Sequence, residues 1–402
     1  MASASETFFD DEQHEASRLK IQAYEKYLQP FAYKVMHYYR RIWVVDGFAG
    51  AGQYGPEANE AAGSPLVAAR FAHKINIART RDGREMLLIN VERDPATFMR
   101  LQRTLAGFGP LVTNMQGRFQ DRLDDVMELV GRDPVFIFLD AFGMESADIR
   151  LIEKILERRG GNQTITELLI HFSDRTLARV AGHLSPGRRD AQAERAGQTK
   201  LRRMDEMIGT SWWRGAFTNP QLKTTEARCD AAAEIYMQQL RQRGIRFVHE
   251  LRMRDAYDAS PRYRLVFTTR SAHGSFLMSD IAAGHEAELF KARFDGTFEI
   301  SWEEQKRRER RDRLRSEIHS WGLDRGFVTP EDVHLHFGPV YFGKWRTSDY
   351  DNCLRELVDL GGIDRVGRSG INRKERLRFA VTLQADLFDS VDSAVSDPPG
   401  TA

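Results

Sequence analysis

The sequence lacks most of the features that mark secreted, disulfide-stabilised or membrane-spanning proteins. Its 402 residues include only two cysteines, Cys229 and Cys353, which are far apart and show no CxxC spacing. This scarcity argues against a disulfide framework and against a cysteine zinc site, as in a reducing cytoplasm. Residues 1–15 are polar and acidic, unlike a signal peptide. No apolar run approaches the roughly 20 residues that cross a bilayer, so we expect a cytoplasmic protein that has no membrane contact.

The chain as a whole also lacks an excess of either charge. Its formal net charge is +1, from 59 basic and 58 acidic residues, which does not indicate a polyanionic partner for the whole molecule. The imbalance is local, because residues 306–315 read KRRERRDRLR, with seven basic residues against two acidic ones. The histidines show no spacing typical of metal ligands, so we expect no bound metal.

Short apolar runs alternate with helical segments through the first two thirds of the chain. The apolar runs lie at residues 42–45, 86–91, 111–115, 135–139 and 168–172. Continuous apolar strands separated by helices indicate a parallel sheet that is covered on both faces. Two further strands, at 247–253 and 263–268, predict an antiparallel hairpin at the end of this sheet. We therefore predict an α/β fold with a mostly parallel Rossmann sheet of the class I methyltransferase type.

A second, smaller domain is predicted after residue 300, where the composition changes. Three helical segments precede a basic strand–turn–strand at residues 363–379, which together describe a winged helix. The predicted domains are a disordered N-terminus (1–14), a methyltransferase-like domain (15–300) with a helical insertion at about 175–245, a winged-helix-like domain (301–384) and an acidic disordered tail (385–402).

The basic side chains of the predicted wing are candidates for contacts with nucleic-acid phosphates. They are Arg365, Arg368, Arg373 and Lys374. The alternatives are a solvated basic surface and a protein-docking module, since winged helices serve in both ways.

A glycine-rich loop follows the first apolar run. Gly50, Gly52 and Gly55 formally match the dinucleotide fingerprint GxGxxG. That fingerprint requires a helix that begins within the loop, whereas here the helix cap, Ser64, comes later in the chain. It also requires an acid about 20 residues further on, and Glu92, the first acid at a strand end, is about twice as far. The loop therefore does not favour a nicotinamide cofactor.

The same loop suits S-adenosylmethionine when it is read from Asp46 through Phe48, Gly50 and Gly52. This cofactor carries an ammonium group and a sulfonium rather than a pyrophosphate, so a strand-end carboxylate suits it. Asp46 can hold the ammonium, directly or through water, while the glycines let the backbone approach closely. Glu92, at the end of the next strand, is placed to accept both ribose hydroxyls. The alternative is a tight turn that binds no ligand.

The loop after the third strand is less informative. An acid that accepts the adenine amino group is commonest at the position of residue 118, which is arginine here. Asp121 is the substitute candidate. It could equally be a first-turn carboxylate that the helix dipole stabilises.

A second chemical site is predicted where the strand at 135–139 runs into Asp140-Ala141-Phe142-Gly143. In amino-methyltransferases of nucleic acids, an acid or amide at this strand end binds the target amino group, and an aromatic residue stacks on the base. Asp140 and Phe142 fall near those roles, but the two prolines that normally lie between them are absent. The alternative is that Asp140 only caps the next element.

These segments together resemble the three-Cys-motif partner family (TcmP), a prokaryotic group with a methyltransferase-like domain. The resemblance covers roughly residues 15–285. It rests on Tyr24 to Tyr27, VVDGFAGAG at 44–52, GSPL at 63–66, Glu92, FLDAFG at 138–143, LLIHF at 168–172, MIGTSWWR at 207–214 and RYRLVFTTRSAHGSFLM at 262–278. The resemblance implies a partner that carries a three-cysteine motif and resembles radical S-adenosylmethionine proteins. It implies no substrate.

Three functions follow as hypotheses. The first is an S-adenosylmethionine-dependent methyltransferase that acts on an amino nitrogen of DNA or RNA. The second is a non-catalytic or partner-dependent accessory protein, with the winged helix as the docking module for the three-cysteine protein. The third is a methyltransferase for small molecules or proteins with the helical insertion as a lid, lined by His171, Arg175, Trp212 and Trp213.

Overall fold

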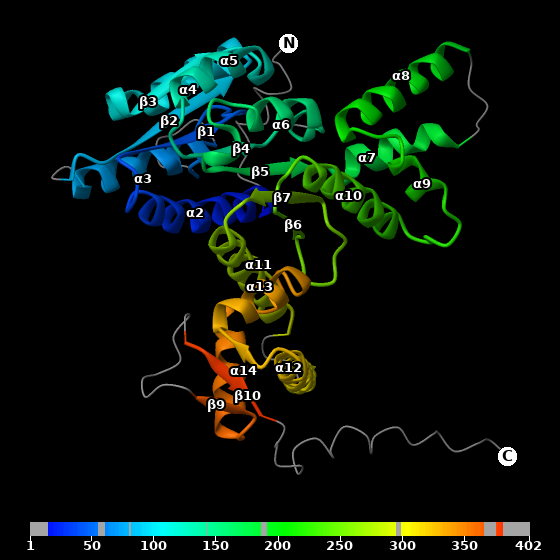
Figure 1. Cartoon of the computed structure of the whole chain (residues 1–402). Coiled ribbons are helices and arrows are strands. Elements are labelled where there is room, and N and C mark those ends of the chain that lie inside the picture. The colour runs from blue at the N-terminus through cyan, green and yellow to red at the C-terminus, as the bar shows by residue number, and fades with distance from the viewer. Residues whose placement is uncertain are drawn as a thin grey trace. The chain divides into compact units, whose positions relative to one another are not determined.

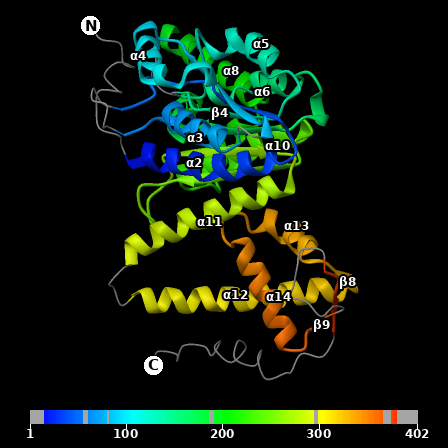
Figure 2. The ribbon, with the colours of Figure 1, turned by 90° about the vertical axis from the view of Figure 1, so that its left-hand side faces the viewer.

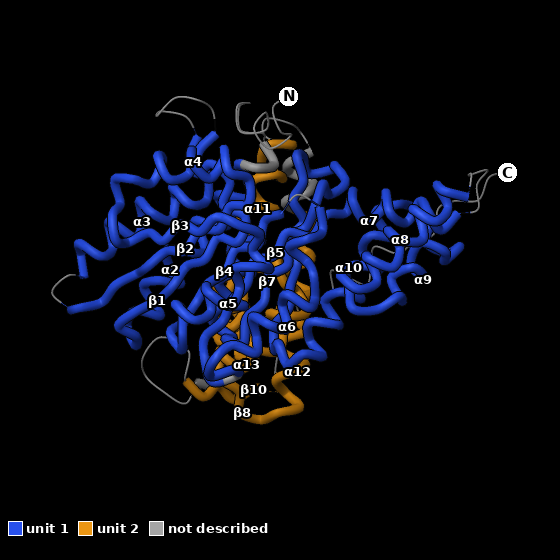
Figure 3. The backbone as a smooth tube through the Cα atoms, turned by 90° about the horizontal axis from the view of Figure 1, so that it is seen from above, with its two compact units in different colours: residues 1–282 blue, residues 283–402 orange. Residues whose placement is uncertain are grey.

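The computed structural model describes residues 15–54, 61–79, 82–141, 143–185, 191–294, 299–365 and 375–380. The chain divides into two compact units, residues 1–282 and 283–402 (Figure 3). This division falls within helix α11 (Ala272–Phe294), whereas the sequence places the domain boundary at residue 300, inside helix α12 (Glu299–Leu323). The expected disordered segments at 1–14 and 385–402 lie outside the described residues.

The first unit is built on a seven-stranded sheet (Figure 1). Its strands are β1 (Arg41–Asp46), β2 (Glu85–Glu92), β3 (Val112–Gln116), β4 (Val135–Leu139), β5 (Thr166–Phe172), β6 (Phe247–Met253) and β7 (Tyr263–Thr269). Their order in the sheet is β3-β2-β1-β4-β5-β7-β6. The pairs from β3 to β5 are parallel, and β7 runs antiparallel to both of its neighbours. The predicted class I methyltransferase sheet, with its antiparallel hairpin, is confirmed.

Helices cover both faces of this sheet, which explains why central strands such as β4 are buried along their whole length. On one face, Tyr24 and Tyr27 of α2 pack on Phe136 of β4, with ring centroids 5.8 and 5.2 Å apart. On the other face, Ile137 and Leu139 of β4 join a core with side chains of α5 and α6. Figure 2 shows α2 and α3 side by side. The helices around β1 to β5 are α2 (Glu15–Val35), α3 (Ser64–Arg79), α4 (Pro95–Leu105), α5 (Phe119–Val130) and α6 (Ile149–Leu156), with short 3-10 turns at Ala106–Leu111, Glu145–Ala147 and Gly161–Gln163.

Four helices and a 3-10 turn fill the connection between β5 and β6, where the sequence predicts a helical insertion. They are α7 (Asp174–Ala181), the turn Gly182–Leu184, α8 (Ala191–Ile208), α9 (Trp213–Thr218) and α10 (Thr225–Gln242). The helices lie together beside the sheet (Figures 1 and 3). Trp213 is buried among them and its indole N–H donates to Asp205 at 2.9 Å, whereas Trp212 is 67% exposed. Trp213 is therefore a packing residue of the insertion.

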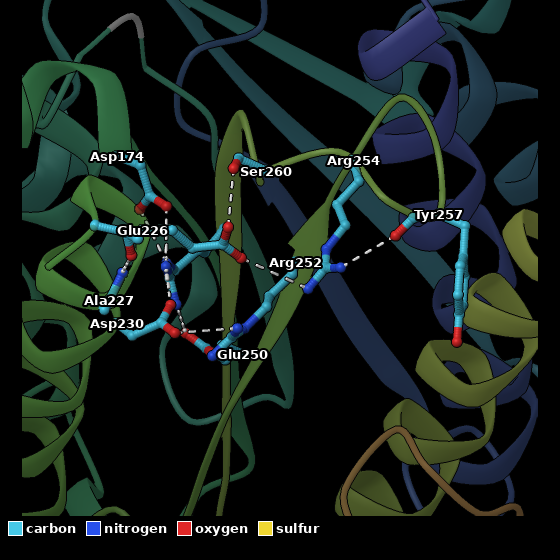
Figure 4. Close-up of polar contacts among 11 residues, drawn as sticks. Asp174, Glu226, Ala227, Asp230, Glu250, Arg252, Arg254, Tyr257 and Ser260 are labelled. Carbon is cyan, nitrogen blue, oxygen red and sulfur yellow. Dashed lines mark hydrogen bonds and ion pairs between the residues drawn. The ribbon is translucent and has the colours of Figure 1, made fainter. Parts of the chain in front are cut away.

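A buried arginine ties the insertion to the sheet. Arg264 of β7 is completely buried, and its guanidinium donates to Asp174 of α7 at 2.9 Å, Asp230 of α10 at 2.6 Å and Glu250 of β6 at 2.7 Å. Figure 4 shows the three acidic side chains converging. Because four elements share one cation, this cluster, which we call the Arg264 cluster, fixes where the insertion begins and ends.

The second unit contains helices and a small sheet. After α12 come β8 (Phe327–Val328), α13 (Pro330–Val340), α14 (Thr347–Asp359), β9 (Ile363–Arg365) and β10 (Leu377–Phe379). The strands form an antiparallel sheet in the order β8-β10-β9. Arg365 contributes backbone to β9, whereas Arg368, Arg373 and Lys374 lie outside the described residues. Their predicted phosphate contacts remain predictions.

Cysteines, metal-ligating side chains and long apolar helices can be examined in both units. Cys229 and Cys353 are both buried free thiols. Within the described ranges, no cluster of His, Cys, Asp or Glu could hold a metal ion. The helices described here are all too short or too polar to span a bilayer.

Candidate cofactor and acceptor site

Asp46 ends β1 at the carboxyl edge of the sheet and is 2% exposed. Its Oδ1 accepts the backbone N–H of Phe48 at 3.1 Å, and its Oδ2 accepts the hydroxyl of Ser64 at 2.6 Å. Burial raises the pKa of Asp46 to about 7, because removal from water penalises the carboxylate more than these two hydrogen bonds stabilise it. Near neutral pH this carboxyl group therefore gains or loses its proton easily.

The loop after β1 takes a shape that requires glycine. Gly50 and Gly52 have φ of 59° and 80°, in the left-handed region that other residues rarely adopt. The N–H of Gly63 donates to the carbonyl of Gly52 at 2.9 Å, and a Cβ at position 63 would lie 2.9 Å from that oxygen. The loop is thus closed at its base by backbone that approaches backbone closely.

Glu92, at the end of β2, lies beside this loop. Its Oε2 accepts the N–H of Gly50 at 2.9 Å and its Oε1 accepts the N–H of Asp94 at 2.7 Å. Burial raises its pKa, and the backbone donors oppose the rise. Since a carboxylate oxygen can accept more than one hydrogen bond, Glu92 retains capacity for two further donors, such as a pair of hydroxyls.

Asp121, the predicted acceptor for the adenine amino group, lies in the first turn of α5 beside Gln120. The Asp121 side chain is exposed in the first turn of α5. The Oε1 atom of its neighbour Gln120 is buried, and none of the described residues donates to it. Gln120 is thus a second candidate beside Asp121, and it was not predicted from the sequence because only acids were considered. An amide oxygen accepts the same hydrogen bond, so an amide in the first turn of α5 was the available signal.

Asp140 lies at the end of β4, as expected, but it already has a charged partner. The ammonium of Lys20, on α2, forms an ion pair with its carboxylate. Burial alone would lower the pKa of Lys20, yet Asp140 outweighs burial and the pKa is raised. Sequence reasoning missed Lys20. Phe142, the predicted stacking residue, lies outside the described residues.

Two further polar groups near these acids are buried without a partner among the described residues. They are the hydroxyl of Tyr24 and the Nδ1 atom of His171, at the end of β5. Burial lowers the pKa of His171 to about 4, so its ring is neutral at physiological pH. Its ring centroid lies 4.7 Å from that of Tyr263. Of the four proposed lid residues, His171 interacts electrostatically with Asp140, whereas Trp213 packs within the insertion.

The arrangement fits a zwitterionic organic ligand that carries several hydrogen-bonding groups. Carboxylates lie at the ends of three adjacent strands, β2, β1 and β4, and ligands of open α/β sheets bind at this edge. Unpartnered buried polar atoms call for an explanation, and an absent ligand or water supplies one. Among the buried polar atoms that lack a partner in the described residues are Tyr24 Oη, Gln120 Oε1 and His171 Nδ1. S-adenosylmethionine, with its ammonium, ribose and adenine amino donors, matches these acceptors.

Comparison with known proteins finds only distant similarity to solved structures. No protein-family model and no curated protein match it. It is similar to M. jannaschii TYW2 in complex with AdoMet at 8% identity over 64% of this chain and 77% of that chain, with a TM-score of 0.32. It is also similar to an O-methyltransferase from Bacillus cereus in complex with SAH at 11% identity over 66% and 86% of the two chains, again with a TM-score of 0.32. Such low scores carry no functional argument, so the methyltransferase-like fold rests on the strand order.

Proposed function

We propose that this chain is an S-adenosylmethionine-dependent methyltransferase of the three-Cys-motif partner group that it resembles, and that it acts on an amino nitrogen of a nucleic acid. One observation carries the proposal. Asp46 and Glu92 end two adjacent parallel strands, and between them lies a loop in which Gly50 and Gly52 have positive φ. Two buried carboxyl groups beside a glycine loop are more than a purely structural turn would need.

The residues present would divide the cofactor among them. Asp46 holds the ammonium group, Glu92 accepts the ribose hydroxyls, and the loop at Gly50 and Gly52 gives close backbone approach. Gln120, rather than the exposed Asp121, accepts the adenine amino group. When bound, the cofactor supplies an electrophilic methyl group. Phe48, whose ring centroid lies 6.1 Å from that of Phe119, borders the loop on its apolar side.

Asp140 would orient the acceptor. Its carboxylate pairs with Lys20 and can still accept an N–H of the amino group, because an ionised carboxylate accepts several hydrogen bonds. His171 is neutral, and its Nδ1 atom can accept a proton or a hydrogen bond from the acceptor. Positioning of the acceptor beside the methyl group would supply much of the rate.

Calorimetric titration with S-adenosylmethionine tests the cofactor site directly. We expect micromolar binding by the wild-type protein that is lost in Asp46→Ala and in Glu92→Ala. Asp125→Ala, an exposed change on α5, is the matched control and should bind like wild type. Binding would justify a labelled-methyl screen on DNA and RNA. No binding by well-folded protein would refute the enzyme and leave a Rossmann-shaped scaffold.

A second candidate function, docking of a three-cysteine protein by the second unit, is favoured by the charge on its helices. Arg311 and Arg315 of the basic run in α12 form ion pairs with Glu356 of α14, so part of the positive charge is neutralised within the unit. Besides Glu356, α14 carries Asp349, Asp351 and Asp359. This surface is less suited to phosphates than the sequence suggests.

Salt-dependent binding of a labelled duplex separates the two candidates. If the wing contacts phosphates, Arg368→Glu and Arg373→Glu should each weaken the affinity and lower the salt slope by about 1. If wild-type protein binds no duplex even at low salt, nucleic-acid recognition by this unit is wrong and docking is favoured. Arg355→Glu, a change at an exposed position of α14, tests whether the effect is confined to the wing.

A further inference from the structure

The carboxylate of the cofactor has no counter-ion among the residues assigned so far. S-adenosylmethionine carries an ammonium, a sulfonium and a carboxylate, and Asp46 is assigned to the ammonium. We infer that the buried ammonium of Lys20 binds the α-carboxylate of the cofactor's amino acid group. This inference rests on the proposed function and adds a residue to it.

The first argument is the set of unused donors on Lys20. An ammonium group has three N–H donors. Among the described residues, Asp140 is the one hydrogen-bonding partner recorded for it, and the ring of Tyr263 lies 5.7 Å from Nζ. The Lys20 side chain is 12% exposed. A buried ammonium with unused N–H donors can bind a second anion. Burial without full pairing costs free energy, so a second anion would stabilise it.

The second argument is position. Lys20 interacts electrostatically with Asp46 at the end of β1 as well as with Asp140 at the end of β4. The ammonium and carboxylate of an α-amino acid are bonded to the same carbon atom. A ligand whose ammonium lies on Asp46 therefore presents its carboxylate to a neighbouring group, and Lys20 is the cation placed there.

The third argument is charge complementarity. When Asp46 is ionised to hold the ammonium, Asp46, Asp140 and Lys20 present two negative charges and one positive charge. The cofactor presents two positive charges and one negative charge. Without Lys20, the cofactor's carboxylate would face two acids, and like charges brought together in a buried site are costly. Lys20 also fits poorly as the methyl acceptor itself, because Asp140 keeps its nitrogen protonated and so without a lone pair.

Calorimetry with two ligands isolates this contact. S-adenosylhomocysteine keeps the amino acid group, whereas 5′-methylthioadenosine lacks it and keeps the adenosine. We expect Lys20→Met to weaken binding of S-adenosylhomocysteine by about 10- to 100-fold, the usual range for a buried hydrogen bond to a charged group. Binding of 5′-methylthioadenosine should change by less than about threefold. Lys20→Arg should recover much of the loss, and Lys26→Met, an exposed change on the same helix, should bind both ligands like wild type.

Each other outcome has a distinct meaning. If wild-type protein binds neither ligand, the proposed function falls and this inference falls with it. If wild type binds both and Lys20→Met binds them unchanged, the inference is overturned and the proposed function stands. Equal weakening of both ligands would show that Lys20 only supports the fold. Tighter binding by Lys20→Met would show that Lys20 obstructs the site instead of completing it.

Discussion

Two clusters of buried charge in the first unit differ in how completely their groups are paired. In the Arg264 cluster, all three nitrogens of the guanidinium donate to carboxylates of Asp174, Asp230 and Glu250. In the cluster of Asp46, Lys20 and Asp140, the ammonium has one hydrogen-bonding partner among the described residues. The Tyr24 hydroxyl and His171 Nδ1, which have none there, interact electrostatically with Asp46 and Asp140. The first cluster is closed within the protein, and the second is open.

This difference separates structural charge from functional charge. A closed cluster needs no further binding partner, so its ion pairs stabilise the packing of α7, α10, β6 and β7. An open cluster keeps charged and polar groups out of water without full compensation, which costs stability unless a ligand completes it. Burial alone does not distinguish the two, because Arg264 is 0% exposed and Asp46 is 2% exposed.

The largest expected effect is obtained by breaking the closed cluster. Arg264→Met leaves three carboxylates without their shared cation, and loss of one partner from a buried ion pair costs about 3–5 kcal/mol. We expect the free energy of unfolding, measured in denaturant, to fall by about this amount. Arg252→Met is the control, since this arginine pairs with Asp230 and Glu250 but is 32% exposed. Its loss should cost about 1 kcal/mol or less, and equal losses would contradict the comparison.

The open cluster should respond to pH in the opposite sense to a paired carboxylate. Burial raises the pKa of Asp46 from its ordinary value of 3.8 to about 7. The neutral form is therefore favoured in the folded state. Its stabilising contribution is complete below about pH 4 and is lost as the pH rises through about 7.

Asp46→Asn removes this titration. Between about pH 5 and pH 8, the wild-type protein should lose about 2 kcal/mol of unfolding free energy relative to Asp46→Asn, measured in denaturant without ligand. Glu85→Gln, an exposed change on the neighbouring strand, should follow wild type at all pH values. Parallel curves for wild type and Asp46→Asn would show that Asp46 is ionised throughout this range.

The sheet and the open cluster differ in how far the sequence predicts them. Continuous apolar runs such as 135–139 give each strand its own local signal, and the strand-end positions of Asp46, Glu92 and Asp140 follow directly. By contrast, Lys20 reaches Asp140 from a helix far away in the chain, and no spacing encodes that contact. Gln120 is recognisable only after its oxygen is found to be buried and unpartnered.

Helix α11, strand β8 and the burial of Arg264 were not predicted from the sequence, and each failure has a physical reason. Helix α11 contains Gly274 and Gly284, which normally signal a break, and its buried residues are spread without a clear apolar stripe. Strand β8 has two residues, too few for any alternation to be visible. From its sequence position alone, Arg264 would be expected at an exposed strand position. In the structure it is buried and pairs with acids of β6, α7 and α10. Long-range burial is the information that a local pattern lacks.

Glu92 is intermediate between the two clusters, because each of its oxygens has one donor and room for another. Glu92→Gln should weaken S-adenosylmethionine binding by about tenfold, the usual loss for one hydrogen bond to a charged group. The unfolding free energy should change less than in Arg264→Met, since the amide can still accept one of the two backbone donors. Calorimetry and denaturant unfolding of the same preparation check both statements. An unchanged affinity would mean that Glu92 only supports the loop.

The smallest effect is expected where ion pairs are partly exposed. Glu356 bonds to both Arg311 and Arg315, much as Arg264 bonds to several acids, yet its side chain is 34% exposed. If burial decides the energy, Glu356→Gln should lower the unfolding free energy of the protein by about 1 kcal/mol or less, despite its two partners. Asp312→Asn, which is 52% exposed and pairs with Arg315, is the matched control and should cost still less. A loss of unfolding free energy as large as that of Arg264→Met would contradict this view. It would mean that the number of partners, rather than their burial, determines how much a charge cluster stabilises the fold.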